Sequence, residues 1–131
     1  MKFHHIGLVV KNLFIGLNEI SKITKIKFKS KLIKDKNLGV NIIFIKTENS
    51  PLVELIAPIN KNSPIHNTLK KKINIINHFA YKSKTFEKDI IKIKKKGFFQ
   101  ITKPTKAKYF NHKKVTFFMS KLNHIVEIIE D

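Results

Sequence analysis

The 131-residue sequence predicts an α+β fold made of two successive βαβββ modules. Strands predicted at residues 3–10 and 76–82 each carry a histidine, and each is followed by an apolar strand carrying a glutamate 49 residues after that histidine. These four residues, called the quartet below, are His5 with Glu54 and His78 with Glu127. A shift of 73 residues maps the first pair onto the second, and it also maps Val53–Ile56 onto Val126–Ile129. Self-similarity at a fixed spacing indicates that one supersecondary unit occurs twice.

The first module is placed at about residues 1–58 and begins with the strand at 3–10. Asn12 is a favourable N-cap for a helix whose apolar residues recur at helical spacing, namely Leu13, Leu17 and Ile20. Lysines and apolar residues alternate over 25–32, which is typical of a half-exposed strand. Two further strands complete this module, at 39–46 and 52–57.

A connecting helix is predicted at about residues 63–72, with Ser63 as N-cap and Pro64 at the first helical position. The second module, about 74–131, repeats the plan of the first. Its strand at 75–82 leads to a helix at 86–96 that Gly97 ends. Four strands follow, near 98–102, 108–110, 113–119 and 123–130. With no long linker between the modules, we treat 1–131 as a single domain.

The formal charge of +18 raises the question of nucleic-acid binding. All 27 basic residues are lysine, and they are spread along the whole chain. Proteins that read bases depend on the bidentate arginine fork, which this chain lacks. We therefore expect a solvated basic surface with no nucleic-acid partner. Its field would still attract a small anionic substrate.

The apolar stretches near the N-terminus bear on where in the cell the protein is found. The longest uncharged one, Ile6–Val10, is far too short for a signal peptide or a membrane span. A cytoplasmic protein with no membrane partner is therefore expected.

Each member of the quartet is a lone polar group in a row of apolar neighbours, because side chains alternate along a strand. A glutamate buried without a partner costs several kcal/mol or becomes neutral. Two such glutamates, each repeated with a histidine, favour a bound dication. The chain has no cysteine, so two imidazoles and two carboxylates would hold one divalent ion, Ni, Co, Mn, Fe or Zn. The alternative is that the histidines are satisfied core residues and the glutamates pair with lysines.

The other histidines are expected to serve no site. By strand alternation, His4 faces away from His5. His66 falls in the connecting helix, His112 in a basic loop and His124 just before the last strand, where surface or turn positions are expected.

Several segments resemble the vicinal oxygen chelate superfamily, which includes glyoxalase I and methylmalonyl-CoA epimerase. They are Phe3–Leu13, Val53–Pro58, Asn77–Tyr81, Phe110–Val115 and Val126–Glu130. The resemblance covers nearly the whole chain. It implies that the two modules form a cupped mixed sheet, that the quartet holds the metal, and that the protein is a homodimer.

The resemblance also implies a function, a metal-dependent isomerase, epimerase or lyase. Such an enzyme acts beside a metal-bound carbonyl of a small anionic substrate through an enediolate, with Glu127 as the proton carrier. The resemblance would place a second acid/base carboxylate near residues 40–44, where this chain has Val40–Phe44 without one. The alternative is a binding protein of the same superfamily that sequesters a small molecule without chemistry.

Overall fold

The computed structural model describes residues 1–72 and 75–131. Their strands form one mixed sheet in the order β2-β4-β5-β1-β6-β10-β9-β7, with β3 paired to β4 and β8 paired to β9. The predicted α+β class is confirmed. The predicted start of the second module, residue 74, lies outside the described residues.

The first module contains one helix and five strands. Its elements are β1 (Lys2–Val9), α1 (Leu13–Ser21), β2 (Ile26–Lys29), β3 (Ile33–Asp35), β4 (Val40–Thr47) and β5 (Leu52–Pro58). Asn12 caps α1 as predicted, because its side chain accepts hydrogen bonds from the backbone N–H groups of Phe14 and Ile15.

The connecting helix and the second module follow. Their elements are α2 (His66–Lys71), β6 (Ile76–Ser83), α3 (Phe86–Lys95), β7 (Phe99–Gln100), β8 (Thr105–Lys106), β9 (Lys114–Met119) and β10 (Ile125–Glu130). Gly97 follows α3 in a left-handed conformation, with φ of 89°, as expected for a residue that ends a helix.

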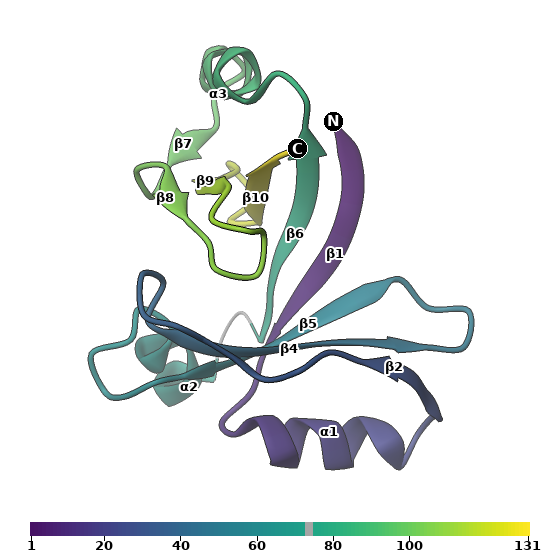
Figure 1. Cartoon of the computed structure of the whole chain (residues 1–131). Helices are drawn as coiled ribbons and strands as arrows, with labels where there is room; N and C mark the ends of the chain where they lie inside the picture. The colour runs from purple at the N-terminus through teal and green to yellow at the C-terminus, as the bar shows by residue number, and fades with distance from the viewer. Residues whose placement is uncertain (73–74) are drawn as a thin grey trace.

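The two modules meet at the centre of the sheet, where β1 and β6 run side by side and antiparallel (Figure 1). Each of these strands pairs on its other side with the last strand of its own module, β1 with β5 and β6 with β10, both in parallel. Helix α1 packs on the first module through Leu13, and α3 packs on the second through Phe86, Ile90 and Ile93. Each of these helices therefore packs on the strands of its own module. The four central strands, β5, β1, β6 and β10, carry the quartet.

The pairing of β1 with β6 contains two β-bulges. Phe3 pairs with Tyr81 and His5 with Ala80, so His4 is an extra residue on β1. Further along the same pair of strands, Gly7 pairs with His78 and Leu8 with Ile76, which makes Asn77 the extra residue on β6. A bulge interrupts side-chain alternation and redirects the residue at the bulge.

Three of the predicted elements differ from the structure, one in type and two in their bounds. The strand predicted at 108–110 is part of a turn, since Asn111 and His112 have positive φ and the chain folds back on itself. The strand predicted at 25–32 ends at Lys29, and β3 follows as a separate strand. The helix predicted at 63–72 spans His66–Lys71. Its N-cap is Ile65, which makes no side-chain cap hydrogen bond, and the hydroxyl of the predicted N-cap Ser63 is buried without a hydrogen-bond partner among the described residues.

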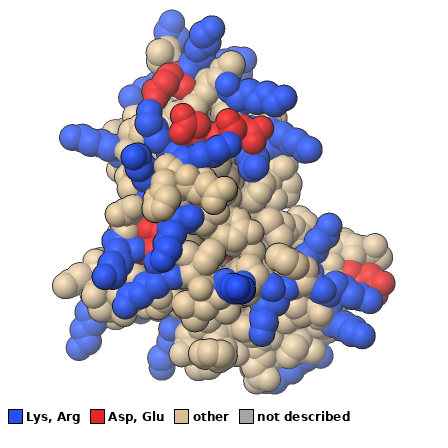
Figure 2. Space-filling model, in the orientation of Figure 1, with Lys and Arg blue, Asp and Glu red and all other residues tan. Residues whose placement is uncertain are grey.

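The surface is strongly basic. Figure 2 shows lysines spread over both modules on one face of the molecule, without a single concentrated patch. Among the described residues, none of the helices has the length and apolar character needed to cross a bilayer.

Candidate metal centre

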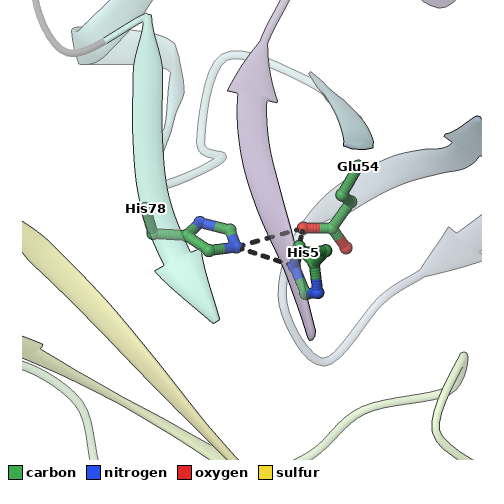
Figure 3. Close-up of side chains that lie close together, drawn as sticks. All are labelled: His5, Glu54 and His78. Carbon is green, nitrogen blue, oxygen red and sulfur yellow. Dashed lines mark hydrogen bonds and ion pairs between the residues drawn. The ribbon is translucent and has the colours of Figure 1, made fainter. Parts of the chain in front are cut away.

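The structure brings the quartet together at the centre of the sheet. The Nε2 atoms of His5 and His78 lie 3.0 Å apart, and Glu54 Oε2 is 3.3 Å from each of them. Glu127 Oε2 lies 3.3 Å from the Nε2 of His5 and 3.4 Å from that of His78. In Figure 3 the two imidazoles approach each other from neighbouring strands, with the Glu54 carboxylate beside them. All four side chains are supplied by one chain.

Strand alternation places His5, Glu54 and Glu127 on buried faces, as predicted. On β1, His5, Gly7 and Val9 are buried on one face. Glu54 lies on the face of Ile56, whereas its neighbours Leu55 and Ala57 pack in the cluster under α1. Because His78 lies opposite Gly7, its ring occupies space that any larger residue would fill, and a Cβ atom at position 7 would overlap the imidazole.

The electrostatics of the quartet follow from burial and proximity. Burial alone would raise the pKa of Glu54, but contacts with His5 and His78 outweigh it and lower this pKa to about 2. Burial alone would lower the pKa of His78, but the carboxylates of Glu127 and Glu54 raise it to about 9. A positive charge between the two carboxylates is therefore strongly favoured. A proton on His78 supplies one such charge, and a dication would supply more.

The donor set fits a divalent ion. His5, Glu54 and His78 each offer a buried ligand atom, and these atoms all lie within 4.8 Å of one another. Glu127 reaches both imidazoles, yet its Oε2 is buried and has no hydrogen-bond partner among the described residues. A buried carboxylate oxygen that has ion-pair contacts but no hydrogen bond is incompletely satisfied, and a metal ion would satisfy it. Two imidazole nitrogens and two carboxylates suit a first-row transition ion.

A cavity of about 320 Å³ opens onto the quartet. Glu54, His78 and Glu127 line it, whereas His5 is fully buried. Its remaining wall is mainly apolar, from Val40, Ile42, Ile56, Val115, Phe117 and Ile125. A few polar side chains lie among them, including Asn37, Asn77, Thr68, Thr102 and Thr105. Among the described residues, no lysine and no carboxylate outside the quartet lines this cavity.

Aromatic rings close the site on the side of His5. Phe110 stacks on the His5 ring at 6.2 Å between centroids, and Phe44 meets it edge-to-face at 5.1 Å. Tyr109 in turn stacks on Phe44 at 3.9 Å. The backbone N–H of Lys108 donates to the buried carboxylate of Asp35, which fixes this turn against the first module.

The sequence prediction that His4 faces away from the site is wrong. As the extra residue of a bulge, His4 turns its Nδ1 to within 2.8 Å of the Nδ1 of His5. Burial and the adjacent His5 lower the pKa of His4 to about 4. Asn77 has the same relation to His78, with its Oδ1 3.0 Å from Nδ1, and sequence reasoning assigned it no role. Their position directly before each histidine was the available signal.

The remaining histidines lie away from the quartet as expected. His112 and His124 are exposed, and His66 is half-buried at the start of α2.

Comparisons with known proteins agree with this architecture. The model of the Glyoxalase/Bleomycin resistance protein/Dioxygenase superfamily matches residues 4–117. A hypothetical protein from Bacillus halodurans C-125 superposes with a TM-score of 0.81 at 24% identity, covering 99% of this chain and 94% of that one. No curated protein sequence matches the chain.

Two solved structures of methylmalonyl-CoA epimerase are also similar. The enzyme from Mycobacterium tuberculosis gives a TM-score of 0.82 at 15% identity, with 98% of this chain and 87% of that one covered. A Streptomyces coelicolor variant in complex with 2-nitronate-propionyl-CoA gives 0.78 at 16% identity, with coverage of 100% and 94%. At these identities the likeness establishes the fold.

Proposed function

The chain belongs to the Glyoxalase/Bleomycin resistance protein/Dioxygenase superfamily, and we propose that it is a metal-dependent isomerase, epimerase or lyase acting beside a carbonyl. The observation that carries this proposal is the convergence of the quartet at the wall of a mainly apolar cavity. His5, Glu54, His78 and Glu127 would hold one divalent ion. When bound, that ion would supply Lewis-acid chemistry at the substrate carbonyl.

Glu127 is the proposed proton carrier. It lines the cavity, so a substrate carbon held there comes within reach of its carboxylate. His5 is the anchoring ligand, because its ring is enclosed by Phe44 and Phe110 and does not line the cavity.

The cavity also supports a proposal about the substrate. Its apolar wall suits the acyl or alkyl part of a small molecule, and its amides and hydroxyls suit a few hydrogen bonds. An anionic group would interact with the lysines of the outer surface, since no lysine lines the described cavity. A structurally similar epimerase is seen in complex with methylmalonyl-CoA, so an acyl thioester is a reasonable first probe.

Proton exchange with solvent tests the proposed reaction. The metal-loaded protein is incubated in deuterated water with methylmalonyl-CoA or with a hemithioacetal. We expect deuterium to appear at the carbon beside the carbonyl, because a proton on a carboxylate exchanges with solvent before it returns. Absence of exchange with every carbonyl substrate tried would contradict an isomerase or lyase.

Matched glutamine variants separate the two roles given to Glu127. Glutamine keeps an oxygen for a metal but cannot accept a proton. With saturating metal, Glu127→Gln should remain slower by roughly 10²–10⁴-fold, the range for a lost general base. Glu54→Gln, the equivalent change in the first module, should recover most of its activity. Equal recovery of both variants would remove the proton-transfer role from Glu127.

A binding protein of the same superfamily, which sequesters a small molecule, is the second candidate. One observation favours it, since no carboxylate outside the quartet lines the described cavity to act as a second acid or base. Metal analysis of the purified protein separates the two candidates. A stoichiometric divalent ion supports the enzyme, and ligand binding by a metal-free protein supports sequestration.

We also propose a homodimer. Light scattering should give about twice the 15.3 kDa of one chain, and a mass near that of one chain would contradict this assembly.

A further inference from the structure

Two residues outside the quartet occupy matching places in the two modules. His4 directly precedes His5, Asn77 directly precedes His78, and the shift of 73 residues that relates the histidines also relates these two neighbours. Both are the extra residue of a β-bulge in the pairing of β1 with β6. The same distortion of the backbone therefore occurs twice, each time one residue before a histidine of the quartet.

Each bulge residue contacts the imidazole nitrogen that faces away from the centre of the quartet. His4 Nδ1 lies 2.8 Å from His5 Nδ1, and Asn77 Oδ1 lies 3.0 Å from His78 Nδ1. The Nε2 atoms of the same two rings point to the centre, 3.0 Å from each other. In a regular strand, residues next to each other would point to opposite faces, so these contacts depend on the bulges.

The chemistry of imidazole gives these contacts a consequence. A neutral imidazole has one N–H and one lone pair, so a ring that offers Nε2 to a cation carries its hydrogen on Nδ1. That Nδ1–H needs an acceptor within the protein, because His5 is fully buried and His78 is 2% exposed. His4 Nδ1 is such an acceptor for His5, and Asn77 Oδ1 is such an acceptor for His78.

We propose that His4 and Asn77 are positioning residues that keep a hydrogen on Nδ1 of His5 and His78, so that Nε2 of each ring is the nitrogen left to bind a cation. This inference rests on the proposed metal-binding function. Groups that orient ligand imidazoles in this way raise metal affinity by fixing both the tautomer and the ring orientation. The bulges are the structural device that brings both acceptors into place.

Nitrogen NMR of the full-length metal-free protein reads the tautomer directly. In a spectrum that correlates the imidazole nitrogens with the ring carbon-bound hydrogens, His5 should show a protonated Nδ1 and a bare Nε2. In His4→Phe, which keeps a ring of similar size but removes the acceptor, that preference should be lost. A wild-type His5 with hydrogen on Nε2 and a bare Nδ1 would overturn the proposal.

Zinc affinity provides the second readout. His4→Phe and Asn77→Leu should each weaken zinc binding by about 10–100-fold, as expected when a partner of a ligating histidine is lost. Asn77→Asp keeps an acceptor oxygen and should recover most of that loss. His124→Phe and Asn67→Leu make the same replacements at exposed positions away from the quartet and should bind zinc as the wild type does.

The two readouts distinguish failure of this inference from failure of the proposed function. Variants of His4 and Asn77 that bind zinc as tightly as the wild type would overturn the positioning role. A wild-type protein that binds no zinc would count against the proposed function, while the nitrogen spectrum would still decide whether His4 sets the tautomer of His5.

Discussion

The two modules use the same inner strands and very different outer parts. In each, a central strand supplies a histidine, a parallel neighbour supplies a glutamate, and a phenylalanine at a matching position meets the histidine edge-to-face. The ring centroids are 5.1 Å apart for Phe44 and His5 and 5.4 Å apart for Phe117 and His78. Outside this core, the four-residue β2 and three-residue β3 of the first module contrast with the two-residue β7 and β8 of the second.

The outer difference gives the two halves of the site different environments. In the second module the short strands leave a turn whose Tyr109 and Phe110 pack on Phe44 and His5 of the first module. Among the described residues no such turn covers His78, which lines the cavity together with Phe117. The two modules therefore supply equivalent pairs of side chains, but His5 is enclosed by aromatic rings and His78 faces the cavity.

The largest effect on metal binding is expected at a position where the two modules differ by a single Cβ atom. Gly7 leaves space for the His78 ring, whereas Ala80, its equivalent in the second module, already carries a Cβ opposite His5. Gly7→Ala should displace His78 and weaken metal binding by more than about 100-fold, since a ligand is lost as well as its support.

Calorimetric titration with zinc measures this effect, and Ala80→Gly is the matched control. That control opens space without displacing a ring, so it should bind zinc nearly as the wild type does. Similar losses in both variants would show that the two modules are equally sensitive at this position, contrary to our account.

The two phenylalanines should differ in their contribution to stability. Phe44 is fully buried and packs against both His5 and Tyr109, so Phe44→Ala should lower the free energy of unfolding by about 3–5 kcal/mol. Phe117 is only half-buried and faces the cavity, so Phe117→Ala should cost about 1–2 kcal/mol. Urea unfolding of the metal-free protein compares them, and equal costs would contradict the difference in enclosure.

The smallest expected effect on stability comes from the residues at the starts of α1 and α3. Asn12 caps α1 without charge, whereas the start of α3 contains Asp89, which accepts hydrogen bonds from Ser83 at 2.6 Å and Thr85 at 3.2 Å. The Ser83 hydroxyl, followed by the smaller contribution of Thr85, lowers the pKa of the Asp89 carboxyl below its usual value. Its stabilisation is therefore present above the unfolded pKa of about 3.9 and is lost as the pH falls through the lower folded pKa.

Asp89 is half-buried and accepts hydrogen bonds from two hydroxyls, so Asp89→Asn should cost about 1 kcal/mol or less at pH 7, and the cost should shrink on acidification toward the folded pKa. Asn12→Ala should cost about 1 kcal/mol at every pH. Urea unfolding at several pH values measures both variants. A cost for Asp89→Asn that grows as the pH falls would have the wrong sign for this explanation.

The sequence predicts the parts of the fold that depend on local patterns. Alternation along the strands correctly places Glu54 and Glu127 on inward faces, and Asn12 caps its helix as expected, because each depends on neighbours within a few residues. The shift of 73 residues predicts that the quartet forms two equivalent pairs. Their convergence in space follows from the pairing of β1 with β6.

Other features depend on contacts that no local pattern contains. His4 turns toward His5 because β1 and β6 pair out of register, and that register is set between residues far apart in the chain. Residues 108–110 look like a strand, but Tyr109 and Phe110 are held in a turn by packing on Phe44 and by the hydrogen bond from Lys108 to Asp35. Tertiary packing overrides β-propensity at such positions.

The most direct test of the account is an anomalous diffraction map of crystals grown with nickel or zinc and collected at the absorption edge of that metal. We expect one strong peak at the junction of β1, β5, β6 and β10, bonded to both imidazole Nε2 atoms and to the carboxylates of Glu54 and Glu127. A peak only at surface histidines such as His112 or His124, with the quartet empty, would contradict it.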